Sequence, residues 1–101
     1  RTPLQALDFP AGYKTVMGIA EIAPGASSGR HTHPGIETGY ILGGEVVMSI
    51  DGQPDQTLKA GDSYQIAAGV PHDVKSTGAE PAKAIATYVV DASKPLASPA
   101  K

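Results

Sequence analysis

The residues of this chain that could do chemistry are three histidines and one glutamate. His31 and His33 are two positions apart, so on a β-strand both imidazoles point to the same face. Glu37 has the same parity and can share that face once a bend at Pro34-Gly35 is allowed for. Neutral imidazoles and a carboxylate that converge in one pocket suit Fe, Mn, Ni, Cu, Co or Zn better than Ca or Mg. His72 would have to come from a different strand to complete such a site.

The composition limits which other sites and partners are possible. The chain has no cysteine, which excludes disulfides, thiolate metal sites and a cysteine nucleophile, so any metal must use histidine and carboxylate ligands. The net charge is -2 and there is no basic block, so we expect neither nucleic acid nor a membrane surface as a partner. Apolar stretches are far shorter than the roughly 18 residues that cross a bilayer, which predicts a soluble protein. Because Arg1 rather than Met comes first, we expect an upstream start, and a periplasmic, secreted or cytoplasmic location stays open.

The length and the turn content predict one small all-β domain. A chain of 101 residues has the size of a single domain, and Gly 12 with Pro 9 implies many turns. No window shows helical apolar spacing behind a capping residue, so we expect no long amphipathic helix. Short strands that recur about every 8 to 12 residues are typical of a sandwich or barrel. We predict a tight hairpin turn at Asp51-Gly52 and strands at residues 14–22, 45–50, 56–58, 63–66, 72–76 and 83–90.

The two ends of the chain lack this periodicity. We therefore divide the sequence into an N-terminal segment (1–12), a barrel domain (13–91) and a C-terminal tail (92–101). We expect both end segments to lie along the surface or across a partner subunit. Apolar side chains in the N-terminal segment and on one polar strand face predict a homodimer. These residues are Leu4, Leu7, Phe9 and Val47.

Two motifs contain the three histidines. The first has the pattern Gly25-x5-His31-x-His33-x3-Glu37-x6-Gly44, and the second has the pattern Gly61-x5-Ala67-x-Gly69-x2-His72. The first matches the first motif of the cupin superfamily. The second resembles the second cupin motif, with Ala67 where proline is usual. The chain therefore resembles a minimal single-domain cupin.

This resemblance implies a fold and a set of metal ligands. The fold would be a double-stranded β-helix, the cupin or jelly-roll barrel of two antiparallel sheets. One divalent transition metal would lie near its centre, held by His31, His33, Glu37 and His72. A histidine in isolation is more often a solvated side chain, and Glu37 by itself would be a surface carboxylate. Since all three histidines fall at ligand positions of one pattern, the metal site is favoured.

The ligand set suggests two functions. Three imidazoles and one carboxylate leave about two open positions on an octahedral metal, which a bidentate oxygen ligand can fill. By resemblance to small cupin dioxygenases, one hypothesis is a metal-dependent oxidoreductase acting on a small organic substrate such as a diketone, phenol or flavonoid. In that enzyme Glu37 could double as a catalytic base, as in some cupins. The alternative is a non-catalytic cupin that binds or senses a small molecule.

Two other classes are disfavoured. A sugar-phosphate isomerase needs clustered basic residues, and here they are scattered singly. A regulator is disfavoured because no helix-turn-helix segment is attached. By their parity Arg30 and Thr32 should face away from the ligands, and we interpret Tyr40, Tyr64 and Tyr88 as packing residues rather than catalytic groups.

Overall fold

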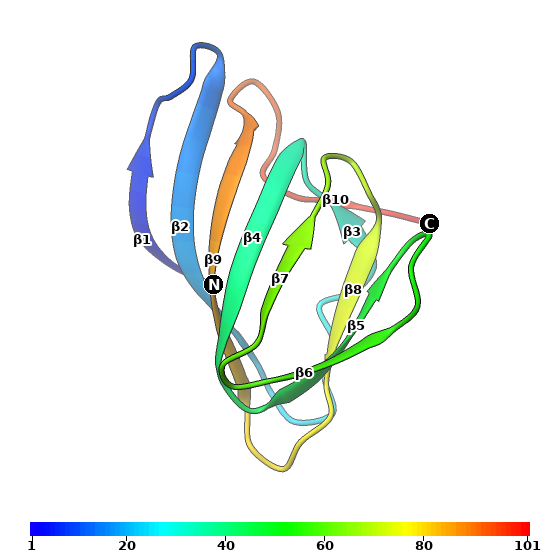
Figure 1. Cartoon of the computed structure of the whole chain (residues 1–101). Helices are drawn as coiled ribbons and strands as arrows, with labels where there is room; N and C mark the ends of the chain where they lie inside the picture. The colour runs from blue at the N-terminus through cyan, green and yellow to red at the C-terminus, as the bar shows by residue number, and fades with distance from the viewer.

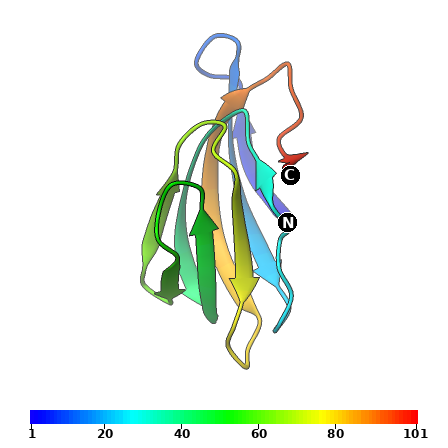
Figure 2. The same cartoon turned by 90° about the vertical axis from the view of Figure 1, so that its right-hand side faces the viewer.

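A computed structural model describes all of residues 1–101 as ten strands without a helix. The strands are β1 (Thr2–Leu7), β2 (Tyr13–Ile22), β3 (His31–Thr32), β4 (Gly35–Gly43), β5 (Glu45–Ile50), β6 (Gln56–Lys59), β7 (Ser63–Ile66), β8 (His72–Ser76), β9 (Ala82–Asp91) and β10 (Ser98–Pro99). One sheet has the order β1-β2-β9-β4-β7, and the other has the order β10-β3-β8-β5-β6. All pairings are antiparallel, and the sheets form two layers (Figures 1 and 2). The predicted all-β barrel of two antiparallel sheets is confirmed.

The core lies between the two sheets because strand residues alternate between the inner and outer faces. On β4 the inward positions Gly35, Glu37 and Ile41 are buried and Gly39 is half-buried, while the outward positions Ile36, Thr38, Tyr40 and Leu42 are exposed. The main apolar cluster joins both sheets and consists of Ile41, Val46, Met48, Ile50, Leu58, Ile66 and Ala82. A second cluster on β9 consists of Ala86, Tyr88 and Val90. No element of the structure is a helix long and apolar enough to cross a bilayer.

The six strands predicted from the sequence match β2, β5, β6, β7, β8 and β9 to within one residue at each end. The sequence did not predict β1 or β10, which lie at sheet edges. Both contain a proline, which an edge strand tolerates because one side of its backbone needs no partner. These strands form because β2 and β3 offer unpaired backbone groups beside them. The local sequence pattern does not show that such a neighbouring strand is available.

The connection between β5 and β6 is longer than the tight turn that we expected at Asp51-Gly52. Pairing with β6 begins only at Met48 opposite Gln56, whereas β5 continues along β8 to Ile50. Asp51 is then held by a hydrogen bond from its amide to the carbonyl of Pro71. The chain does turn at Asp51-Gly52, where the amide of Gln53 donates to the carbonyl of Ile50 at 3.0 Å and Gly52 has a φ of +82°, but residues 53–55 separate this turn from β6.

Gly44 is the corner at which the chain passes from β4 in one sheet to β5 in the other. Its φ is +78°, and a Cβ there would lie 2.7 Å from both the Cα of Ala82 and the carbonyl oxygen of Pro81. Gly43, next to it, has open space at its Cβ position and no positive φ. The backbone therefore requires glycine at position 44 but not at position 43.

We expect Gly44→Ala to lower the free energy of unfolding by more than the roughly 1–2 kcal/mol that the left-handed conformation alone costs a residue with a Cβ. Gly43→Ala is the matched control and should stay within about 0.5 kcal/mol of the parent. Urea unfolding followed by circular dichroism measures both. Equal stability of the two variants would contradict this account of the corner.

The outer face of the sheet that contains β4 is almost uncharged. Ile36, Tyr40 and Leu42 point outward from β4 and are 47%, 48% and 44% exposed. The strand registers place Val89 beside Ile36 and Ile85 beside Tyr40. Charged side chains occur only at the ends of this face, as the Glu21–Lys83 ion pair and as Asp91. Its five strands have 6, 10, 10, 9 and 4 residues, and at about 3.3 Å per residue and about 4.8 Å between strands they present on the order of 600 Å², against the roughly 800 Å² that each partner contributes to a stable interface.

The homodimer expected from the sequence stays a prediction, and this face gives it a place. An uncharged face can pack against a copy of itself without bringing like charges together. A carboxylate introduced on this face is present on both copies of a symmetric dimer, so the two charges repel each other. Light scattering after size exclusion should give about twice 10.3 kDa for the parent and 10.3 kDa for Ile36→Glu/Tyr40→Glu. Ala23→Glu/Ala79→Glu, which adds the same charge at two exposed positions in other loops, should remain dimeric. A monomeric parent would overturn the prediction.

Candidate metal centre

The fold brings the four predicted ligands into one buried cluster. His31 lies on β3 directly opposite His72, the first residue of β8, and His33 follows β3. Glu37 enters from β4 in the other sheet. The three imidazole rings lie 4.2 to 5.0 Å apart between centroids, and one nitrogen of each lies within 4.8 Å of the others. The structure thus places these four residues together, and the three histidines could hold a metal ion.

Backbone carbonyls orient all three rings. Nδ1 of His31 donates to the Gly29 carbonyl at 2.7 Å, and Nδ1 of His72 donates to the Val70 carbonyl at 2.9 Å. Nδ1 of His33 donates to the Leu96 carbonyl at 2.7 Å. A carbonyl can only accept, so each neutral ring carries its proton on Nδ1 and keeps a lone pair on Nε2. The three Nε2 atoms are thereby in the state that a metal requires.

The inward-facing nitrogens lack partners of their own. Nε2 of His33 and Nε2 of His72 are buried and make no hydrogen bond, although they lie 3.0 and 3.5 Å from Oε1 of Glu37. Buried polar atoms are rarely left unpaired. Two ligands that are each about 2.1 Å from a metal are about 3.0 Å apart at a right angle and about 3.4 Å apart in a tetrahedron. The spacing and the donor set of these residues therefore fit a divalent transition metal.

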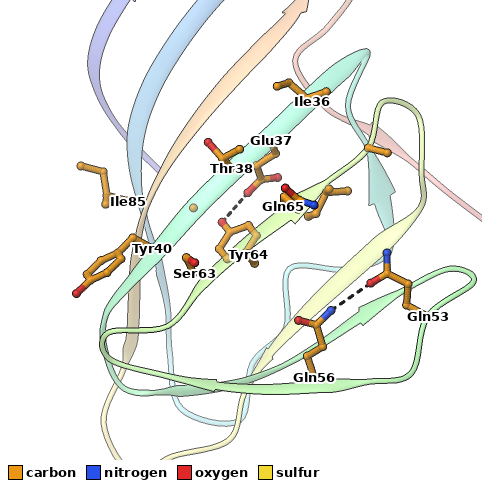
Figure 3. A pocket seen from close by; sticks show the side chains of 13 residues that line it. Ile36, Glu37, Thr38, Tyr40, Gln53, Gln56, Ser63, Tyr64, Gln65 and Ile85 are labelled. Carbon is orange, nitrogen blue, oxygen red and sulfur yellow. Dashed lines mark hydrogen bonds between the residues drawn. The ribbon is translucent and has the colours of Figure 1, made fainter.

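Glu37 is held by a third partner, the hydroxyl of Tyr64. This hydroxyl donates to Oε2 of Glu37 at 2.6 Å from the neighbouring strand β7 (Figure 3). Gly39 makes the approach possible, because a Cβ there would lie 2.2 Å from the Tyr64 ring. Burial by itself raises the pKa of Glu37, but the pKa falls to about 2 when protonated His33 and His72 rings and the Tyr64 hydroxyl face the carboxylate. The carboxylate is therefore ionised inside the barrel.

The remaining titratable groups of the cluster are shifted by the same surroundings. Burial lowers the pKa of His31. Burial also opposes the charge on His72, but the Glu37 carboxylate beside it raises its pKa. Burial and the Glu37 charge raise the pKa of Tyr88 to about 12 and move the pKa of Tyr64 further upward. Both tyrosines consequently keep their protons at neutral pH.

A small cavity of about 90 Å³ lies against His31, His72 and Glu37 inside the barrel. Its walls are mostly apolar and include Ile22, Ile41, Met48, Val74 and Ala84.

A larger hollow of about 900 Å³ runs along β4 and β7 and contains no histidine. In Figure 3 Thr38 and Gln65 lie beside the pair formed by Glu37 and Tyr64, whereas Gln53 lies apart and accepts a hydrogen bond from Gln56. Glu37 lines both spaces, but only the smaller cavity is also lined by His31 and His72, so it is the place where a ligand of the metal would sit.

Two contacts of the site escaped the sequence analysis. Tyr64 was interpreted as a packing residue, and no local pattern shows that its hydroxyl reaches a buried carboxylate on another strand. The Leu96 carbonyl belongs to the tail, 63 residues from His33. Arg30, as expected, faces away from the ligands and pairs with Asp51 at the surface.

Comparison with known proteins agrees with the fold and the motifs. The family model described as "Cupin domain" matches residues 18–88, which is more than half of the chain. The chain belongs to the cupin family. Within curated sequences, this cupin is 47% identical over 57 residues to the HTH-type transcriptional regulator PuuR of Escherichia coli (strain K12). That match covers 55% of the chain and 30% of the regulator, so the chain spans about a third of this relative.

Solved structures give further cupin neighbours. The DMSP lyase DddQ from Ruegeria pomeroyi DSS-3 has a TM-score of 0.76 at 24% identity, covering 84% of this cupin and 42% of that chain. A protein described as a predicted oxalate decarboxylase from Thermotoga maritima has a TM-score of 0.66 at 27% identity. That comparison covers 88% of this cupin and 92% of the other chain. The first of these likenesses shows the fold alone, and this cupin spans less than half of the lyase.

We expect the purified protein to bind about one divalent transition metal ion per chain, because the two unpartnered Nε2 atoms and the ionised carboxylate need a cation between them. His31→Ala/His72→Ala should lose that ion. Asp55→Ala/Glu80→Ala, which changes two exposed carboxylates far from the rings, should retain it. Elemental analysis after dialysis gives the stoichiometry. Unchanged metal content in the double histidine variant would contradict the site.

Proposed function

We propose that this cupin binds one divalent transition metal through His31, His33, Glu37 and His72 and acts as a dioxygenase on a small organic substrate that chelates through two oxygens. The observation that carries the proposal is the pair of buried, unpartnered Nε2 atoms facing the ionised carboxylate of Glu37. Such a metal would supply Lewis-acid chemistry and, for Fe, Mn, Ni or Cu, activation of dioxygen.

The surroundings of Glu37 favour its role as a ligand over its role as a base. A group with a pKa of about 2 has little affinity for a proton at neutral pH, and an efficient general base has a pKa near the working pH. The hydrogen bond from Tyr64 also fixes one oxygen of the carboxylate, as the partners of metal-bound carboxylates commonly do. In this proposal Tyr64 keeps Glu37 oriented and ionised.

The lack of a suitable base favours dioxygen chemistry over proton abstraction. Tyr64 and Tyr88 hold their protons at neutral pH, and Glu37 does not accept one. A dioxygenase reaction that places both atoms of dioxygen in the product needs no external reductant, and the proton that a chelating enol or catechol loses can pass to solvent, so no strong side-chain base is required. It therefore makes the smallest demand on the side chains that line this cavity.

The cavity supports a small substrate. Its volume of about 90 Å³ is well below the roughly 300–1,000 Å³ of pockets that enclose drug-sized ligands. A molecule with two adjacent oxygens and a short apolar remainder satisfies both the open metal positions and the apolar walls. A larger substrate would place only its chelating end beside the histidines.

The second candidate is a ligand-sensing cupin without turnover. It is favoured by the 47% identity to part of a transcriptional regulator. A regulator was disfavoured from the sequence, but the match shows that a segment similar to this chain occurs as one part of such a protein. The same buried site would then hold an effector, and no chemical step would follow.

Oxygen uptake separates the two candidates. We expect the protein loaded with Fe, Mn, Ni, Cu or Zn in turn to consume dioxygen with at least one diketone or catechol, measured with an oxygen electrode. Glu37→Gln should reduce the rate at least 10-fold, because mutation even of a residue that only hydrogen-bonds a metal ligand typically lowers activity by that amount or more. Asp55→Ala/Glu80→Ala should retain it. If calorimetry shows that the protein binds such a molecule but no metal supports oxygen uptake, the dioxygenase proposal is overturned and the ligand-sensing cupin is supported.

A further inference from the structure

The C-terminal tail runs along the short strand that carries two of the histidines. Residues Ser98 and Pro99 of β10 pair with Thr32 and His31 of β3, and Figure 2 shows the tail lying beside this strand. The amide of Ala100 donates to the carbonyl of Arg30 at 3.0 Å. The strand β3 has only two residues and pairs with β8 at a single position, so the tail supplies much of its backbone pairing.

Arg30 fastens the end of the tail. Its Nε donates to the carbonyl of Lys101 at 2.7 Å, while its terminal nitrogens bind both carboxylate oxygens of Asp51. A guanidinium held by a bidentate carboxylate has a fixed orientation, which suits it to hold a third group. The tail is thus attached on both sides of the segment that approaches His33.

Leu96 is the point where the tail enters the site. Its half-buried side chain packs against the cluster of Ala86, Tyr88 and Val90, and its carbonyl accepts the Nδ1 proton of His33 at 2.7 Å. The carbonyls that orient His31 and His72 are each only two residues away from their ring. Their placement therefore follows from the local chain, whereas the orientation of His33 depends on docking of the tail.

We propose that Leu96 is a positioning residue of the metal centre: docking of its side chain holds its carbonyl where it keeps the proton of His33 on Nδ1 and Nε2 free for a metal. The part of this inference that concerns metal affinity rests on the proposed metal site. The part that concerns the ring of His33 does not, because it describes the protein without metal.

Docking of the tail and binding of the metal must affect each other equally. If tail docking strengthens metal binding, metal binding must strengthen tail docking by the same factor. The amide of Ala100, which is protected only while the tail is paired with Arg30, should therefore exchange with solvent more slowly when metal is added.

The test compares Leu96→Asp with Ala97→Asp. The first places a carboxylate among apolar side chains and should release the tail, while the second adds the same charge at the next, exposed position and leaves Leu96 in place. Long-range proton–nitrogen correlation spectra of the metal-free protein at pH 8.5 show which ring nitrogen of His33 carries the proton. We expect Nδ1 in the parent and in Ala97→Asp, and a mixture of both forms in Leu96→Asp.

Titration with Zn²⁺ supplies the second measurement. Leu96→Asp should bind Zn²⁺ about 10- to 100-fold more weakly than Ala97→Asp, which is the usual effect of losing a partner that orients a metal-bound histidine. Leu96→Ala replaces Leu96→Asp if the latter does not fold. An unchanged tautomer of His33 together with unchanged Zn²⁺ affinity in the variant would overturn the inference. Absence of Zn²⁺ binding in the parent would instead count against the proposed function, and the tautomer would still decide the role of Leu96.

Discussion

An ionised carboxylate inside a small barrel is the constraint on which the rest of this site depends. Glu37 is only 6% exposed, and a buried charge is unfavourable unless it is paired and hydrogen-bonded. Its partners come from both layers, Tyr64 from the sheet of Glu37 itself and His72 from the opposite sheet. The contacts that keep this carboxylate charged therefore also join the two sheets at the centre of the molecule.

Several unrelated features of the chain follow from that arrangement. The absence of a side chain at Gly39 leaves room for the Tyr64 ring to cross β4 and reach the carboxylate. The register that places His31 opposite His72 brings two rings together from adjacent strands. Carbonyl acceptors behind the rings turn the protonated nitrogens away from Glu37, so that lone pairs and negative charge gather at one point. That concentration is unfavourable without a cation, which is why the geometry implies one.

The site restricts the chemistry more than the fold does. Cupin neighbours include a lyase and a protein described as a predicted decarboxylase, so the barrel is compatible with different reactions. In this chain Tyr64 and Tyr88 hold their protons at neutral pH and Glu37 binds none, while His31 and His72, which also line the cavity, are the candidate metal ligands. A reaction at this site would then depend on the bound metal and on the fit of a small molecule, since acid–base chemistry by Tyr64, Tyr88 and Glu37 contributes little.

The sequence by itself determined the fold class, six of the ten strands and the four residues that meet in the site. Alternation and turn residues are local signals, and the spacing of His31, His33 and Glu37 within one motif is also local. Only the tertiary structure decided that Tyr64 bonds to Glu37, that β6 pairs with β5 only from Gln56 onward, and that the tail reaches His33 through Leu96. The physical reason is that each of these depends on a partner from a distant part of the chain. The sequence around a side chain or a carbonyl is the same whether or not such a distant partner is present.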